Sequence, residues 1–155
     1  MALLESKRIK NLVELESWIG LSLIPVLLEA GPQVVLCLEG PMGAGKTQAV
    51  RLILRNLGAE EDVQSPSFAI HNRYIFLSGH VDHVDLFRLE NEEELESTGF
   101  WDLLAQPKAF VLIEWPERLP DQSLPIHWRQ FKLKVDFVEG DVSGSERELL
   151  FFSIP

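Results

Sequence analysis

The feature that most constrains the fold is a glycine-rich stretch between a buried-type strand and an amphipathic helix. The segment "QVVLCLEG" (33–40) is almost entirely apolar, which is typical of a strand buried on both faces of a parallel sheet. The segment "KTQAVRLILRNLG" (46–58) carries apolar residues at helical spacing and closes on a glycine. Strand, glycine loop and helix in this order begin an α/β nucleotide-binding unit.

The loop itself, "GPMGAGKT" (40–47), fits the phosphate-loop pattern of glycine, any four residues and then Gly-Lys-Ser/Thr. Glycines let successive amide hydrogens turn inward around an anion, and the following helix adds its positive end. We expect Lys46 to reach the β- and γ-phosphates, and the hydroxyl of Thr47 to complete the coordination of Mg²⁺. The residues predicted to contact the nucleotide here are Gly40, Pro41, Met42, Gly43, Ala44, Gly45, Lys46, Thr47 and Gln48.

A magnesium-nucleotide site also needs a carboxylate at the carboxyl end of a neighbouring strand. Glu114 follows the apolar run "AFVLI", and Asp85 lies on the same face as His83 in the alternating run "VDHVDL". We therefore predict Thr47, Asp85 and Glu114 as the metal side of the site. Lys46, Asp85 and Glu114 are the predicted catalytic residues, and the pattern leaves open whether Glu114 binds the metal or orients the attacking water.

The rest of the pattern predicts one α/β domain over residues 1–155, with a P-loop fold, a central, mostly parallel sheet between helices, and an antiparallel C-terminal hairpin. Pro25 is expected to interrupt the helix at 14–30. The other expected elements are a first strand at 8–12, a strand pair at 68–77 and 80–89, a helical turn or two from residue 90, a strand within 108–120 and the hairpin within 130–154.

The charge balance bears on possible partners. With 14 Lys plus Arg against 24 Asp plus Glu, the net charge is −10, which disfavours a broad face for nucleic-acid backbones. The only cysteine, Cys37, lies in the apolar run and is expected to be a core side chain. No signal-like or membrane-spanning stretch is found, so we expect a cytoplasmic protein with no membrane contact.

Five motifs together resemble the bacterial tRNA threonylcarbamoyladenosine biosynthesis ATPase family TsaE, also known as YjeE. They occur in the family's order and at similar separations: "GPMGAGKT" (40–47), "SPSF" (65–68), "HVDLFRL" (83–89), "ELESTGFWDLL" (94–104) and "EWPERLP" (114–120). The resemblance implies a small ATPase that binds ATP or ADP with Mg²⁺ and works with the proteins TsaB and TsaD. Those partners place a threonylcarbamoyl group on adenosine 37 of tRNA, and tRNA is contacted only through the complex.

Carried over by residue, the resemblance implies that segment 65–68 is switch-like, with Ser67 near the γ-phosphate or metal, and that Trp115 lies beside the nucleotide. Ser67 replaces the family's usual threonine but keeps the hydroxyl. Phe87 replaces a usual tyrosine, and Pro41 and Met42 replace a usual Asp-Leu pair, without removing a group that the chemistry requires.

Turnover is expected to be slow unless a cation completes the site. Arg88 in the chain itself or an arginine of a partner could supply that cation. Two other functions stay open: a small-molecule phosphotransferase, and a non-catalytic module that uses bound nucleotide to stiffen the fold.

Overall fold

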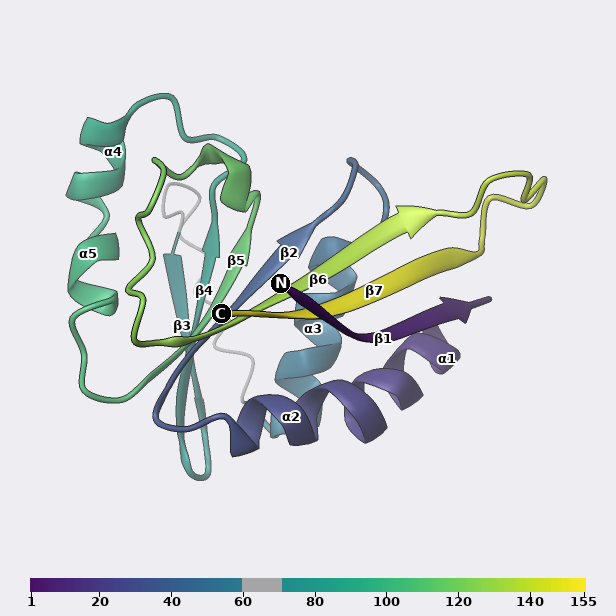
Figure 1. Cartoon of the computed structure of the whole chain (residues 1–155), viewed down its shortest axis with the longest axis horizontal. Helices are drawn as coiled ribbons and strands as arrows, with labels where there is room; N and C mark the ends of the chain where they lie inside the picture. The colour runs from purple at the N-terminus through teal and green to yellow at the C-terminus, as the bar shows by residue number, and fades with distance from the viewer. Residues whose placement is uncertain (60–70) are drawn as a thin grey trace.

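The computed structural model describes residues 1–59 and 71–155, so the predicted switch-like segment, with Ser67, lies outside the described residues. The chain forms a seven-stranded sheet in the order β1-β7-β6-β2-β5-β4-β3, with helices on both faces (Figure 1). The strands are β1 (Ala2–Ile9), β2 (Gln33–Glu39), β3 (His71–Phe76), β4 (Gly79–Asp85), β5 (Ala109–Glu114), β6 (Arg129–Phe137) and β7 (Arg147–Ile154).

The four central strands, β6, β2, β5 and β4, are parallel to one another. The sheet becomes antiparallel at its edges, where β3 pairs with β4 and β7 pairs with β6 and β1. The α/β class, the central parallel strands and the C-terminal hairpin are therefore confirmed. Every residue of β5 is buried, and so are the five inner residues of β2, which is why both read as continuous apolar runs.

One face of the sheet is covered by α1 (Leu12–Trp18), α2 (Ile24–Glu29) and α3 (Lys46–Leu57). A π-helical segment, Ile19–Leu23, joins α1 to α2. Its last turn includes a hydrogen bond from the Ile24 amide to the Ile19 carbonyl, five residues back. Pro25, at the first turn of α2, cannot donate a backbone hydrogen bond, and the helix accommodates it directly after this wider turn. The predicted interruption at Pro25 is confirmed.

The other face is covered by two short helices, α4 (Glu92–Ser97) and α5 (Phe100–Leu103), which lie opposite α1, α2 and α3 in Figure 1. This side of the core includes Cys37, and burial raises the pKa of its thiol to about 12. Cys37 is thus a core side chain, as predicted. No helix in the described ranges is long and apolar enough to cross a membrane.

The prediction of a first strand at 8–12 is wrong. Strand β1 spans Ala2–Ile9, and Asn11 already caps α1, because its side-chain oxygen accepts from the amide of Glu14. As an edge strand, β1 is held by backbone pairing with β7, and most of its side chains are exposed. It therefore lacks the apolar pattern that would mark it in the sequence.

A fully buried carboxylate, Asp82, lies near the middle of β4 on the α4–α5 face. Arg73 of β3 donates to both of its oxygens, at 2.8 and 3.1 Å, and His71 Nε2 lies 2.7 Å from Oδ1. Burial alone would raise the pKa of Asp82, but the hydrogen bonds from His71 and Arg73 outweigh it and lower that pKa overall.

We expect Asp82→Asn to lower the free energy of unfolding at pH 7 by about 2 kcal/mol, because it removes the charge of a buried carboxylate that accepts hydrogen bonds from the exposed Arg73 and from His71. The stabilisation is present above the unfolded pKa, near about 4, and is lost as the pH falls through the lowered folded value. Wild type and variant should therefore converge below about pH 4 in urea denaturation series.

Asp121→Asn is the matched control, since Asp121 is an exposed carboxylate. It should change the free energy of unfolding by less than about 0.5 kcal/mol. Equal stability of Asp82→Asn and wild type at pH 7 would contradict this account of the Asp82 cluster.

Candidate functional site

The glycine-rich loop, residues 40–45, joins the end of β2 to the start of α3. Gly40 has a φ of +145°, and a Cβ at this position would lie 2.0 Å from the carbonyl oxygen of Val135 in β6. Gly45 caps α3 with a left-handed φ of 114°. The loop path therefore requires glycine at both ends: at Gly40 for the close approach to β6, and at Gly45 for the turn into the helix.

A cleft of about 350 Å³ opens beside this loop. It is lined by Met42, Gly43, Gly45, Lys46, Thr47, Gln48, Asp85, Phe87, Glu114 and Trp115. All of these except Phe87 are residues that the sequence predicted for the site. The loop and both strand-end carboxylates thus meet in one place.

The strand register explains why the two carboxylates meet. Glu114 of β5 pairs with Leu38 of β2 on one side and with Asp85 of β4 on the other. All three strands are parallel, so their carboxyl ends lie at the same edge of the sheet as the loop that follows β2. This is the edge at which ligands bind in open α/β sheets.

Lys46 lines the cleft and is only 5% exposed. Its ammonium group donates to the carbonyl oxygens of Gly40 and Pro41, and it lies 3.9 Å from the centre of the Trp115 ring. Burial lowers the pKa of Lys46, while the carboxylates of Glu114, Glu117 and Asp85 oppose that change. The cation is thus held at the loop by carbonyl oxygens and an aromatic face.

Glu114 is the buried acidic centre of the site, with 2% exposure. Its Oε1 accepts a hydrogen bond of 2.8 Å from the Thr47 hydroxyl, and its Oε2 lies 2.6 Å from Nε2 of His83. Burial alone would raise the pKa of Glu114, but the hydrogen bonds from His83 and Thr47 and the charge of Lys46 lower it overall. The carboxylate is therefore held in its charged form.

The oxygen atoms of Thr47, Asp85 and Glu114 fit Mg²⁺, which takes hydroxyl and carboxylate oxygens together with waters and substrate phosphates. Within residues 1–59 and 71–155, no group of three or more His, Cys, Asp or Glu side chains is arranged to hold a metal alone. Asp85 Oδ1 accepts from the amide of Phe87 at 3.0 Å, which orients the carboxylate at the end of β4.

Two aromatic rings form one wall of the cleft. Phe87 and Trp115 lie 5.1 Å apart between ring centres, tilted by 45°. Trp115 adopts a left-handed backbone conformation, with φ of 60° and ψ of 50°. That conformation costs a non-glycine residue about 1–2 kcal/mol. The backbone strain at Trp115 therefore occurs where its ring is placed over Lys46.

Of the predicted contact residues within the described ranges, three do not line the cleft. Gly40 packs against β6, the carbonyl of Pro41 accepts from Lys46, and Ala44 is buried in the core at 2% exposure. The exposed side chain of Met42 does line the cleft. Arg88, considered above as a cation for the site, is exposed and is not among the lining residues.

The contacts of two residues, His83 and Arg147, were not predicted from the sequence. His83 contacts Glu114, and the only signal for it was its position two residues before Asp85, which places both on one face of a strand. Arg147 donates to the carbonyl of Ala44 from 103 residues away. No local pattern could reveal that contact.

The family model described as threonylcarbamoyl adenosine biosynthesis protein TsaE matches residues 15–146. The TsaE protein of Nostoc is 37% identical over 112 residues, which cover 70% of this chain and 68% of the relative. The TsaE protein of Bacillus subtilis is 34% identical over 125 residues, which cover 81% and 73%.

The TsaE protein of Synechocystis is 38% identical over 88 residues, so this chain spans 56% of that relative's length. Among solved structures, YdiB from Bacillus subtilis superposes with a TM-score of 0.65 at 23% identity, covering 97% of this chain and 86% of that one. The structural match supports the fold. Because the family model covers most of the chain, the protein belongs to the TsaE family of threonylcarbamoyl adenosine biosynthesis proteins.

Proposed function

We propose that this chain binds ATP with Mg²⁺, hydrolyses it slowly, and supports threonylcarbamoyl transfer to adenosine 37 of tRNA together with TsaB and TsaD. One observation carries the ATPase part: Lys46, Thr47 and Glu114 meet in one cleft at the N-terminus of α3. Family membership supports the tRNA part, since the matching relatives are named for this biosynthesis.

In this proposal the loop amides and the N-terminus of α3 hold the phosphates of ATP or ADP. Lys46 exchanges its carbonyl partners in the loop for phosphate oxygens. Thr47 and Asp85 hold the metal, and Glu114 either completes that shell, directly or through water, or orients the attacking water. When bound, Mg²⁺ neutralises charge on the β- and γ-phosphates. Trp115 and Phe87 shield one side of the cleft.

Slow turnover follows from the charges of the cleft. Among its described lining residues Lys46 is the only cation. A second cation that stabilises the transition state is worth about 10³–10⁵-fold in comparable enzymes. We therefore propose that binding to TsaB and TsaD completes the site. The net charge of −10 favours contact with tRNA through those partners rather than through this chain. We propose that the complex works in the cytoplasm.

Steady-state ATP hydrolysis with and without TsaB and TsaD tests this function. We expect slow hydrolysis by the chain alone and at least about a tenfold increase with both partners, because a completed site stabilises the transition-state charge. In a gel-shift assay the chain alone should not retard tRNA.

Other outcomes would support the two alternatives. No turnover even with both partners would indicate a non-catalytic nucleotide-binding module. Consumption of ATP in equal amounts with a small-molecule acceptor would indicate a phosphotransferase. Tight tRNA binding by the isolated chain would contradict the indirect contact.

A further inference from the structure

The β6–β7 hairpin packs against the phosphate loop. Gly40 packs against the carbonyl of Val135 in β6, and Phe137 at the end of β6 lies 4.0 Å from the Cβ position of Gly43. Arg147, the first residue of β7, lines a second groove beside the loop together with Ala44 and Val135. It is not among the residues that line the nucleotide cleft.

Arg147 donates hydrogen bonds both to the loop and to its own hairpin. On the loop, Nε donates to the Ala44 carbonyl at 2.7 Å and Nη2 donates to the Gly43 carbonyl at 3.4 Å. On the hairpin, Nη1 donates to the carbonyls of Gly144 and Glu146, at 2.7 and 2.8 Å. One rigid guanidinium therefore ties the loop to the hairpin.

Because the peptide bond is planar, the contact with the Ala44 carbonyl also fixes the direction of the amide that follows it. The carbonyl and the amide hydrogen of a trans peptide point in opposite directions. When Arg147 holds the Ala44 carbonyl, the amide hydrogen of Gly45, which belongs to the same peptide, points away from Arg147. Gly45 itself lines both the nucleotide cleft and the groove that contains Arg147. An inward-facing amide is what a phosphate-binding loop must present to an anion.

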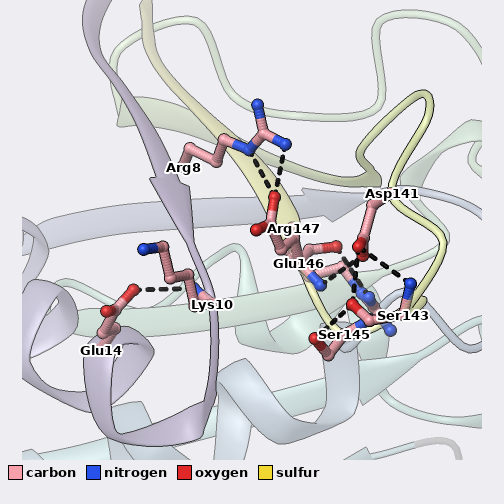
Figure 2. Close-up of polar contacts among 8 residues, drawn as sticks. All are labelled: Arg8, Lys10, Glu14, Asp141, Ser143, Ser145, Glu146 and Arg147. Carbon is pink, nitrogen blue, oxygen red and sulfur yellow. Dashed lines mark hydrogen bonds and ion pairs between the residues drawn. The ribbon is translucent and has the colours of Figure 1, made fainter.

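Arg147 is itself held in place by the polar contacts of the hairpin (Figure 2). Asp141 closes the turn by accepting from the amides of Ser143 and Glu146, at 3.1 and 2.9 Å. Arg8 of β1 pairs with the carboxylate of Glu146 beside Arg147 (Figure 2), but this exposed pair takes no part in the hydrogen bonds of the Arg147 guanidinium and does not position it. The Arg147 guanidinium also lies 4.4 Å from the centre of the Phe137 ring. The side chain is thus pre-arranged before any ligand binds.

We propose that Arg147 is a positioning residue for the phosphate loop: it fixes the Ala44 carbonyl, so that the Gly45 amide of the same peptide bond is turned toward the nucleotide phosphates. The Ala44 amide is already used within the loop, where it donates to the Pro41 carbonyl at 3.1 Å. This inference rests on the proposed nucleotide binding. It assigns Arg147 a role in affinity for ligands that carry a β-phosphate, with no contact to the ligand itself. The partial positive charge of the Gly45 amide is then in place without reorganisation when a nucleotide enters.

The test compares Arg147→Ala, Arg147→Lys and the control Arg8→Ala, which removes the other arginine that contacts this hairpin. Arg147→Ala should weaken the binding of both ATP and ADP about tenfold, and kcat at saturating ATP should stay within about threefold of wild type. Arg147→Lys should recover part of the affinity, since an ammonium group can replace one of the loop contacts. Arg8→Ala should stay within about twofold of wild type.

A second measurement needs no nucleotide. In ¹⁵N relaxation experiments on the ligand-free protein, the heteronuclear NOEs of the Ala44 and Gly45 amides should fall in Arg147→Ala and remain unchanged in Arg8→Ala. If Arg147→Ala does not fold, the same two measurements on Arg147→Lys decide the question.

The outcomes separate this inference from the proposed function. If wild type fails to bind ATP, the proposed function is wrong. Unchanged relaxation of the loop amides in Arg147→Ala would overturn the role of Arg147 in ordering the loop, whether or not ATP binds. If wild type binds ATP and the Arg147 variants bind it within twofold of wild type, the positioning role is wrong while the proposed function stands.

Discussion

Replacing Lys46 with alanine is expected to lower kcat/KM for Mg-ATP hydrolysis about 10²–10³-fold, because it removes the cation of the cleft that neutralises charge developing on the phosphates. The fold should tolerate the change. Burial lowers the pKa of Lys46, so keeping this side chain charged in the folded protein costs free energy. The melting temperature of the ligand-free variant should therefore stay within about 4 °C of wild type.

Arg51→Ala is the matched control, because Arg51 is an exposed cation on the same helix, α3. Its hydrolysis rate should stay within about twofold of wild type. Hydrolysis and calorimetry on the same preparations separate loss of chemistry from loss of fold. Undiminished hydrolysis by purified Lys46→Ala would refute the assignment of this cleft as the ATPase site.

The parts of the fold that sequence reasoning predicted are those specified by short segments. The apolar run that forms β2, the glycines at 40 and 45 and the helical spacing of α3 each determine local structure over a few residues. The placement of Asp85 and Glu114 at one edge also followed from local information. A carboxylate at the end of a buried parallel strand lies at the same edge as the loop after a neighbouring strand.

The parts that sequence reasoning missed depend on pairing across long separations. β1 joins the sheet through backbone hydrogen bonds to β7, and its exposed side chains carry no pattern. The contact of Gly40 with Val135 and that of Arg147 with Ala44 both require the hairpin to fold back onto the loop. The pairing of His83 with Glu114 depends on two side-chain conformations that neither strand pattern specifies.

Replacing Glu114 with glutamine is expected to lower kcat for Mg-ATP hydrolysis about 10²–10³-fold. The amide keeps the size of the side chain and can still accept the Thr47 hydroxyl, so the change removes mainly the negative charge. Binding of ATP without Mg²⁺ should stay within about twofold or become tighter, because a carboxylate close to the phosphate loop is neutralised. Stopped-flow binding and steady-state hydrolysis, each over a series of Mg²⁺ concentrations, measure both effects.

The magnesium series also separates the two roles left open for Glu114. If Glu114 holds the metal, the Mg²⁺ concentration for half-maximal hydrolysis should rise about tenfold or more in Glu114→Gln, as it should in Asp85→Asn. If Glu114 orients the attacking water, that concentration stays near the wild-type value while kcat still falls. Glu117→Gln is the control, since Glu117 is exposed and close in the chain, and it should keep wild-type kcat within about twofold. A wild-type kcat in Glu114→Gln would exclude both roles, because each requires the charged carboxylate that Thr47 and His83 hold at this position.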